Sequence, residues 1–568
     1  MSTAGPRRGF LRSPHSTWVG VDEIRGNEAG LCYGVFLRSL RRLGLENKPV
    51  PFLGIQERLV ILRVVVARTV GYFQNESRLQ ALGKPYWNHE ERLMDRVNLT
   101  TRRITPICLS VAGLLFSLAT FANDSHPPGK PTEAGANAAS LLRRDPIVQN
   151  AAQTVTQGRE IFRFDTFGDE QFWGDSLQLH KAIEGERFGG VGDGLTPQQA
   201  LGLGLKVDVK ALPRAVVQQL RQGTVDLNDV AITLTLIKQD AVLGVKGTFN
   251  PDGSLKSIGL TCAFCHSTVN DSIAPGVGER LDGWANRDLN VGAIIAFAPN
   301  LQPIVDLLKI VHPDITDSEV RDVLNSWGPG KFDAELLLDG KAFTPEGKPA
   351  AALIPNAFGL AGFNQHTWTG DWGTVPYWNA FVAVLELRGV GTFFDPRLDN
   401  ADKFPIAAAR RFGHISVDPD EDLVTPKLPA LHFYQLALPA PKPKAGVDFD
   451  AEAAKRGHEL FGGKAKCGTC HVEPLWTEPG WNLHTPEEMK IDSFQANRAP
   501  GDSYKTMNLA GIFVRERGLF MRPENKGRFY HDGRFQTLLD VVNSYNERFN
   551  LGLTDQEKRD VVEYLKSL

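Results

Sequence analysis

The sequence predicts a mainly α-helical protein of two domains, the first of which is enlarged by insertions that include a small β-hairpin. Three observations support this fold class. The pentapeptide pattern C-x-x-C-H occurs twice in the 568 residues. A related hexapeptide precedes each copy, QGREIF at 157–162 and RGHELF at 456–461, which indicates a weak internal repeat. Between the two copies lies the proline-rich stretch LALPAPKPKAG at 436–446, which is typical of a domain boundary.

The two motifs contain four of the six cysteines. Their residues are Cys262, Cys265 and His266 in the first copy and Cys467, Cys470 and His471 in the second. A four-cysteine zinc site separates its pairs by about fifteen to twenty residues, whereas roughly 200 residues separate these pairs. A redox dithiol does not explain the repeated histidine. The pattern is that of covalent haem attachment, in which the histidine ligates the iron. The sequence therefore predicts two covalently bound haem c groups.

Helical patterns surround the second motif. Residues 451–461 have an amphipathic period, with Gly457 and Phe461 on one face. The last fifteen residues begin with Thr554 and Glu557, which form a capping box before an apolar helical stripe. A glycine-aromatic helix before a haem motif and a terminal helix that crosses it resemble the cytochrome c fold. We expect this fold for the C-terminal part of the chain.

The first copy has a different layout. About 100 residues separate its hexapeptide from Cys262, and they include a hairpin predicted to turn at 250–253. A further 170 or so follow before the proline-rich stretch. A domain that only passes electrons needs none of this additional chain, so we expect it to shape a pocket. The predicted domains are an expanded N-terminal haem domain at 123–440 and a C-terminal cytochrome c domain at 441–568.

Covalent haem is usually attached outside the bacterial cytoplasm, so an export signal is expected. Residues 94–122 supply one, with a positive start, an apolar centre and small residues before the cleavage site. A membrane anchor is the alternative for this segment. Cys108 would be removed with it. Residues 1–93 are arginine-rich, and we expect the native start at Met94; a genuine cytoplasmic extension with a retained anchor is the alternative. The expected location is the periplasm or the exterior.

One C-terminal segment resembles a known family. Residues 504–545 read YKTMNLAGIFVRERGLFMRPENKGRFYHDGRFQTLLDVVNSY. This block is similar to the C-terminal signature of bacterial dihaem cytochrome c peroxidases, and more so to the MauG-like branch, in which a tyrosine follows the HDGRF-x-TL element. The first domain also contains GREIFRFDTFGDEQFW, RLDGWANRDLNVGAII and HTWTGDWGTVPYWN. These segments look more like the larger dihaem relatives, which include the rubber oxygenases.

The resemblance implies a different role for each haem. The haem held by His266 would bind peroxide or dioxygen on an open side, and the haem held by His471 would transfer electrons. In typical peroxidases the second ligand of the electron-transfer haem is a methionine fourteen residues after the histidine of the HDG element. That position is Tyr545 here. Tyrosinate favours ferric and higher oxidation states.

Other assignments stay open for the same ligand position. Tyr545 falls on an apolar helical face, so a role in the core fits it equally. His531 could ligate the iron or form a structural turn. Met507 and Met521 are the other candidate ligands nearby, although isolated methionines usually pack in cores.

Further roles remain unassigned among several residues. The resemblance implies a tryptophan relay between the haems, with Trp284, Trp368, Trp372 and Trp378 as candidates. Cleavage of peroxide needs an acid–base group, because one oxygen leaves as water. The candidates for this group are Asp282, Asp288 and His366, each of which could instead have a surface or capping role. The sequence does not support a calcium ion, and that question stays open.

We therefore expect an exported dihaem c-type cytochrome that transfers electrons and reduces hydrogen peroxide at the N-terminal haem. The alternatives are a dihaem oxygenase with a hydrophobic substrate near 366–378 and a non-enzymatic electron carrier. The expected partners are a small redox protein or other electron donor, and peroxide or dioxygen. A net charge of −3 gives no indication of nucleic acid binding. After signal cleavage we expect no stable membrane insertion.

Overall fold

The structure is a computed structural model that describes residues 145–343 and 350–568. The chain divides into two compact units, 1–138 and 139–568, and the described residues belong to the second. The predicted signal peptide at 94–122 and the extension before it lie outside the described residues. Among the helices of the described ranges, none combines the length and the apolar character needed to cross a bilayer.

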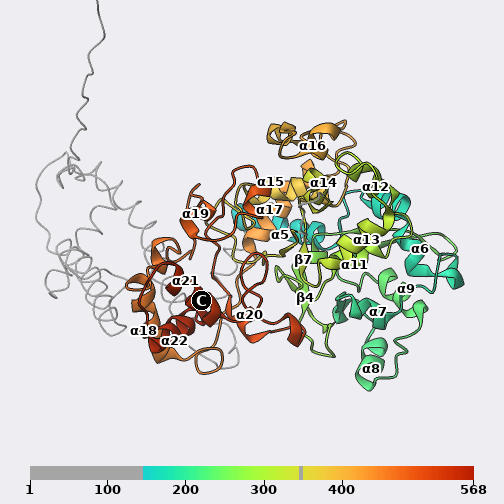
Figure 1. Ribbon diagram of the computed structural model, residues 1–568. Coiled ribbons are helices and arrows are strands. Elements are labelled where there is room, and N and C mark those ends of the chain that lie inside the picture. The colour runs from blue at the N-terminus through green and yellow to red at the C-terminus, as the bar shows by residue number, and fades with distance from the viewer. Residues whose placement is uncertain (1–144, 344–349) are drawn as a thin grey trace, which may run out of the picture. The chain divides into compact units, whose positions relative to one another are not determined.

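Helices dominate the described chain, as predicted, and strands form only short two-stranded sheets (Figure 1). The helices are α5 (Pro146–Phe164), α6 (Leu179–Glu184), α7 (Pro197–Gly202), α8 (Arg214–Gln222), α9 (Val230–Lys238), α10 (Ala263–His266), α11 (Val291–Ala296), α12 (Gln302–Leu308), α13 (Asp317–Ser326), α14 (Leu336–Asp339), α15 (Val375–Phe381), α16 (Pro405–Arg410), α17 (Leu428–Ala437), α18 (Ala451–Gly462), α19 (Pro486–Met489), α20 (Phe513–Arg517), α21 (Leu538–Arg548) and α22 (Asp555–Lys566). The strands are β1 (Val207–Asp208), β2 (Val245–Phe249), β3 (Leu255–Leu260), β4 (Ser267–Val269), β5 (Val277–Gly278), β6 (Arg280–Asp282), β7 (Lys331–Phe332), β8 (Ala352–Leu353), β9 (Phe393–Phe394) and β10 (His414–Ile415).

The predicted β-hairpin is confirmed. Strands β2 and β3 are antiparallel and joined by a turn, in which the Gly253 amide donates to the Asn250 carbonyl at 2.9 Å. Gly253 has a φ of 91°, a conformation that glycine adopts without strain. Strand β3 leads directly into the first C-x-x-C-H motif. At that point the Thr261 hydroxyl donates to the Arg163 carbonyl at 3.1 Å and thus ties the motif to the end of α5.

The C-terminal helices cross at a glycine. Helix α18 matches the predicted amphipathic segment, and α22 starts with the predicted capping box of Thr554 and Glu557. The two helices lie side by side (Figure 1). A Cβ atom on Gly457 would stand 1.9 Å from the Asp560 carbonyl oxygen of α22, so only glycine permits this approach. One turn later, Phe461 meets Tyr564 edge to face, with ring centroids 5.0 Å apart.

An equivalent crossing joins α5 and α17. A Cβ atom on Gly158 would stand 2.0 Å from the Ala430 carbonyl oxygen. Phe162 lies one turn after this glycine and meets Tyr434 edge to face at 5.5 Å. The hexapeptide repeat therefore marks two helix crossings with the same glycine contact and the same aromatic pair.

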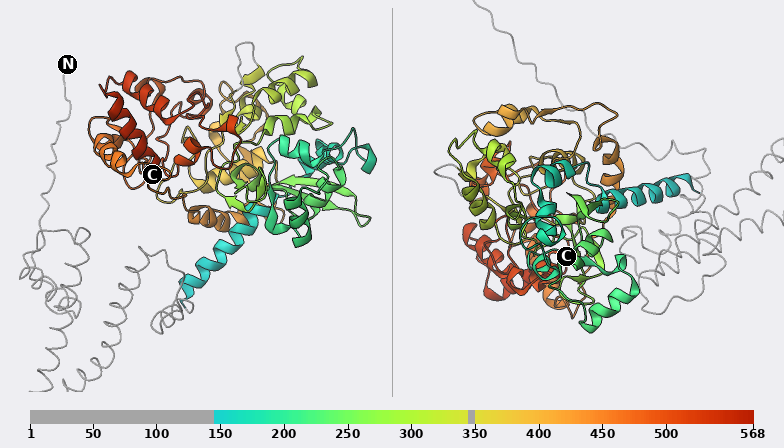
Figure 2. Two further views of the ribbon diagram at one scale, coloured as in Figure 1. Left: turned by 90° about the horizontal axis from the view of Figure 1, so that it is seen from below. Right: turned by 90° about the vertical axis from the view of Figure 1, so that its right-hand side faces the viewer.

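The buried apolar residues form separate clusters along the chain. The two largest clusters draw on residues 155–438, with Ala499 as the exception. A third cluster draws on residues 460–568 and includes the crossing of α18 and α22. In Figure 2 the red C-terminal helices and the green helices of the first part form separate groups. The domain boundary near residue 441 stays a prediction, and this grouping agrees with it.

The C-terminal crossing can be tested by adding one methyl group. We expect Gly457→Ala to reduce the free energy of unfolding by about 1–3 kcal/mol, because the added Cβ forces α18 away from α22. Urea unfolding followed by far-UV circular dichroism measures the change. Gly462→Ala, in the same helix but with nothing within 4 Å of its Cβ position, is the matched control and should leave stability equal or slightly higher. Equal losses in both variants would contradict this account of the crossing.

Candidate functional site

The first motif lines a cavity of about 200 Å³ in the N-terminal part. Cys262 precedes the single turn of α10, which brings Cys265 and His266 to the cavity wall. Two backbone bonds fix the turn: the Gly283 amide donates to the His266 carbonyl at 2.8 Å, and the Asn286 amide donates to the Cys265 carbonyl at 2.9 Å. Burial raises the pKa of both thiols to about 12, so they stay protonated.

The histidine of this motif is neutral and incompletely bonded. Burial lowers the pKa of His266 to about 4, so its imidazole carries no charge at neutral pH. Its Nδ1 atom is buried without a hydrogen-bond partner among the described residues. A neutral imidazole is the form that ligates metals. Together with two thiols on one turn, this donor set fits a covalently attached haem.

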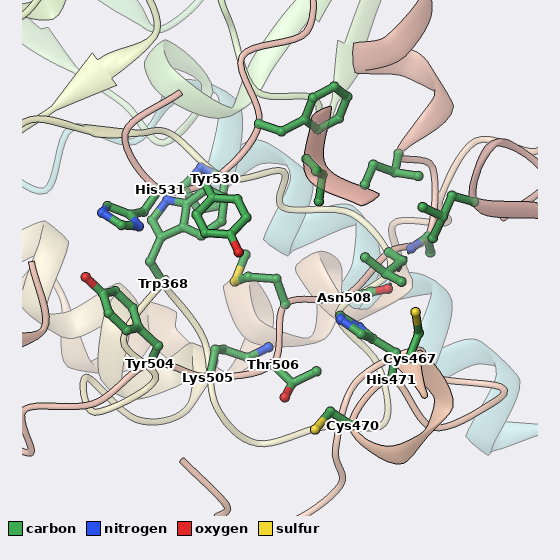
Figure 3. A pocket seen from close by; sticks show the side chains of 18 of the residues that line it. Trp368, Cys467, Cys470, His471, Tyr504, Lys505, Thr506, Asn508, Tyr530 and His531 are labelled. Carbon is green, nitrogen blue, oxygen red and sulfur yellow. Dashed lines mark hydrogen bonds between the residues drawn. The ribbon is translucent and has the colours of Figure 1, made fainter. Parts of the chain in front are cut away.

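The second motif lines a larger cavity of about 540 Å³ (Figure 3). Cys467 lies in a single 3₁₀ turn, and Cys470 and His471 follow it. The His471 Nδ1 proton is donated to the Trp476 carbonyl at 2.9 Å, which fixes the orientation of the ring. Burial lowers the pKa of His471 to about 4. An iron-ligating histidine is usually oriented by such a hydrogen bond from its Nδ1 atom.

Most of the candidate second ligands lie in this same cavity. Tyr545, His531 and Met507 line it, whereas Met521 lines neither of the two cavities. Figure 3 shows Tyr530 and His531 across the cavity from the motif residues. His531 stacks on Tyr504 at 5.1 Å, and its Nε2 lies 3.6 Å from Asp492 Oδ1.

Tyr545 is a half-buried neutral phenol in the described structure. Burial raises its pKa well above the usual value, and a hydrogen bond with Tyr530 adds to that shift. The guanidinium of Arg548, 4.6 Å from the ring centroid, opposes the shift. A bound metal ion would favour the anionic form further. Ligation by Tyr545 stays a prediction, and its position in the cavity with His471 agrees with it.

Three carboxylic acids line the smaller cavity, Asp333, Glu335 and Glu386, and the sequence alone did not indicate them. Glu335 is fully enclosed, and its Oε1 accepts a hydrogen bond from the Trp372 indole at 3.1 Å. Burial raises the pKa of Glu335 to about 7, although the charge of Arg498 opposes the shift. Burial also raises the pKa of Glu386 well above its usual value, against the charge of Arg388. The available signal was an unusual pattern, acids at 333, 335 and 339 within the otherwise apolar FDAELLLDG.

The acid–base candidates from the sequence occupy other places. Asp282 accepts hydrogen bonds from Arg163, Ser267 and Tyr434. Asp288 accepts bonds from Lys206, Asn525 and the Arg522 amide. Neither aspartate lines either cavity. The hydrogen bonds of each therefore have a structural role. His366 does line the larger cavity, where burial lowers its pKa to about 3.

The four candidate tryptophans are now distinguished by position. Trp368 and Trp378 line both cavities, and Trp372 lines the smaller one. Trp284 lines neither and packs against Phe358 and Phe520. The Trp368 indole is held by a hydrogen bond to the Leu353 carbonyl at 2.6 Å.

A buried ion pair connects the segment of Glu335 to the C-terminal part. Arg498 donates to both carboxylate oxygens of Asp339, at 2.7 and 2.8 Å. Its Nη1 lies 2.9 Å from Asp333. All three side chains are at most 1% exposed. Since Glu335 lies between these aspartates in the chain, Arg498 also fixes the position of Glu335.

A second metal-binding arrangement involves one motif cysteine. The ligand atoms of Cys470, Glu478 and His484 lie within 4.8 Å of one another. His484 Nε2 lies 2.6 Å from Glu478 and Nδ1 lies 2.9 Å from Glu488, so both ring nitrogens already have carboxylate partners. A haem thioether at Cys470 would remove the thiolate that such a metal site needs.

Comparisons with known proteins give partial matches. No family model matches the chain. A curated cytochrome c peroxidase of Denitromonas iodatirespirans is 30% identical over an alignment of 154 residues, which covers 20% of this chain and 40% of that protein. This chain therefore spans less than half the length of the curated relative. Among solved structures, a hydrazine synthase of Kuenenia stuttgartiensis is 18% identical, with 41% of this chain and 86% of that chain covered. Its TM-score of 0.21 is too low to support an argument about fold.

The burial of Glu335 predicts a pH-dependent stability. Its pKa rises from 4.5 to about 7 on folding, so ionisation opposes folding as the pH rises. Glu335→Gln keeps the oxygen that accepts from Trp372 and removes this penalty. Relative to the wild type, we expect E335Q to gain stability as the pH rises through 7, by roughly 3 kcal/mol above about pH 8. Urea unfolding from pH 5 to 8 measures it. Glu459 is exposed, so Glu459→Gln should show the same pH dependence of stability as the wild type. If E335Q also showed the wild-type pH dependence, the raised pKa of Glu335 would be refuted.

The Arg498 ion pair predicts a large loss of stability. Arg498→Leu would leave Asp333 and Asp339 buried without their partner, and we expect it to lower the free energy of unfolding by about 3–5 kcal/mol. Arg456 also forms a bidentate ion pair, with Asp560, but its side chain is exposed. Arg456→Leu should therefore have a much smaller effect. Equal losses in both variants, measured by thermal unfolding, would refute the special role of burial.

Proposed function

We propose that the chain is an exported, periplasmic c-type cytochrome with two haems that reduces hydrogen peroxide at the N-terminal site. The match to a cytochrome c peroxidase supports a haem oxidoreductase. The observation that carries the finer proposal is the cavity beside the first motif, where three carboxylic acids and five indoles lie together. A protein that only passes electrons has no use for enclosed acids beside its cofactor.

The residues that would hold the haems come from the two motifs. One haem would be attached at Cys262 and Cys265 and ligated by His266. The other would be attached at Cys467 and Cys470, with His471 as ligand and Tyr545 as the proposed second ligand. Bound in these cavities, each haem supplies an iron that accepts and passes on single electrons. The matched glycine crossings of α5 with α17 and of α18 with α22 support two domains of cytochrome c type.

The protein side chains would supply protons and a route for electrons. Reduction of one hydrogen peroxide to two waters consumes two electrons and two protons. Glu335 can hold a proton at neutral pH and give it to the oxygen that leaves as water. Trp368 and Trp378 line both cavities and offer indole rings between them. The electrons would come from a small redox protein outside the chain.

The test uses protein matured with both haems attached. Mass measurement should give two covalently bound haems, and electron paramagnetic resonance should show a high-spin ferric signal that peroxide removes. We expect Glu335→Gln to lower the turnover of peroxide by about 10²–10⁴-fold, since an acid–base group is lost. The exposed Glu459→Gln should keep wild-type turnover.

Two outcomes would favour the other functions. Low-spin signals that peroxide does not change, in both resting and half-reduced protein, would indicate an electron carrier. Dioxygen uptake with an apolar substrate and without peroxide would indicate an oxygenase.

A further inference from the structure

Three arginines meet beside the larger cavity, and none of them has an acidic partner in the part of the chain that the structure describes. Arg287 and Arg515 line the cavity, and Arg528 lies close to them outside its lining. Arg287 is 5% exposed and Arg515 is 8% exposed. The charges that act on Arg287 come from the other two arginines, and they lower its pKa further after burial has done so. The cluster is therefore a concentration of buried positive charge.

The donors of the two cavity arginines are incompletely used. Among the described residues, the Nε and Nη1 atoms of Arg287 and the Nε atom of Arg515 are buried without a hydrogen-bond partner. Arg515 donates through Nη2 to the Arg528 carbonyl, and its guanidinium lies 4.8 Å from the Phe529 ring centroid. Arg528, in contrast, donates to the Pro329 carbonyl at 2.8 Å and to Asn525 at 3.0 Å. The unused donors belong to the two arginines that line the cavity.

Such an arrangement requires an anion. A guanidinium stays charged under ordinary conditions, so it cannot escape burial by losing its proton. A buried charge without a partner is strongly unfavourable, and a second positive charge beside it adds repulsion. A carboxylate offers two oxygens that match the fork of a guanidinium. A bound carboxylate would therefore reduce both the energetic cost of the buried charges and the repulsion between them.

We propose that Arg287 and Arg515 bind a carboxylate, and that this carboxylate is a propionate side chain of the haem in the larger cavity. The inference rests on the proposed function, because it requires a haem at Cys467 and Cys470. These cysteines, His471 and the two arginines line one cavity. A haem carries its propionates into that cavity on an apolar ring, so they need buried positive partners.

The proposed contact would join both parts of the chain. Arg287 directly follows Asn286, whose amide donates to the Cys265 carbonyl of the first motif. Arg515 belongs to α20 in the C-terminal part. A single propionate bound by both arginines would thus connect the backbone of the first motif to the cofactor of the second. Arg287 and Arg515 are positioning residues in this proposal.

The test is the midpoint reduction potential of each haem in the holoprotein, measured by optical redox titration. Loss of a positive charge at a propionate favours the ferric state, so Arg287→Gln and Arg515→Gln should each lower the potential of the C-terminal haem. We expect about a tenfold change in its reduction equilibrium, about 59 mV for one electron. Arg528→Gln removes the same charge outside the cavity and is the matched control, with a clearly smaller shift. Arg287→Lys keeps the charge and should restore most of the potential.

The outcomes separate the possible sources of the anion. If Arg287→Gln and Arg515→Gln shift the potential no more than Arg528→Gln, the proposal is overturned. If the wild-type potential and melting temperature depend on added phosphate at constant ionic strength, and Arg515→Gln loses that dependence, the pair binds a free anion and not a propionate. Haem content is measured by mass before any titration. A wild-type protein without covalent haem would overturn the proposed function first, and this proposal with it.

Discussion

Two close contacts between a glycine and the backbone of a crossing helix are the constraint on which the rest of the structure depends. Gly158 lies against the Ala430 carbonyl and Gly457 lies against the Asp560 carbonyl. In both places an edge-on phenylalanine–tyrosine pair fills the space one turn further on. These contacts fix where each first helix ends. The second C-x-x-C-H motif follows α18 after four residues, and the first is tied to the end of α5 by the bond from Thr261 to the Arg163 carbonyl. The positions of the two cavities therefore follow from the helix crossings.

Burial then decides the protonation of the groups around the cavities. A low-dielectric environment disfavours charged forms, so His266 and His471 are neutral, Cys262 and Cys265 are thiols, and the carboxyl groups of the smaller cavity hold their protons more tightly. Arginine cannot respond in this way and needs an opposite charge instead. Arg498 has two aspartates, which the chain itself provides. The arginines of the larger cavity have no such partner among the described residues, which is why an external carboxylate is the simplest solution there.

The features that the sequence predicted are those encoded over short distances. The hairpin, helix α18 and the capping box of Thr554 each depend on neighbours a few residues away, and all three are confirmed. The hexapeptide repeat is visible in the sequence, but its meaning required the partner helices, which begin over 90 residues after Phe461 and over 250 after Phe162.

The candidate site was only partly predictable for the same reason. The motif residues carry a local pattern, and the structure places each set on a cavity wall. Glu335 was missed because glutamates are normally exposed, and the acids around it are paired with Arg498, which lies far along the chain. Asp282 and Asp288 were selected for their aromatic neighbours in sequence, whereas in space their hydrogen-bond partners are polar. Burial of charge depends on long-range packing, which local patterns do not contain.

The bond between Thr261 and the Arg163 carbonyl has a consequence for the length of the chain between them. In the C-terminal part, four residues at 463–466 connect α18 to its motif, whereas 97 residues at 165–261 connect α5 to the other. The entropy of closing a flexible loop grows only with the logarithm of its length, so this difference amounts to about 3 kcal/mol. The longer connection leaves and returns at almost the same point and builds its own core. The longer connection is therefore equivalent to an insertion, and its length could change without displacing the motif that follows it.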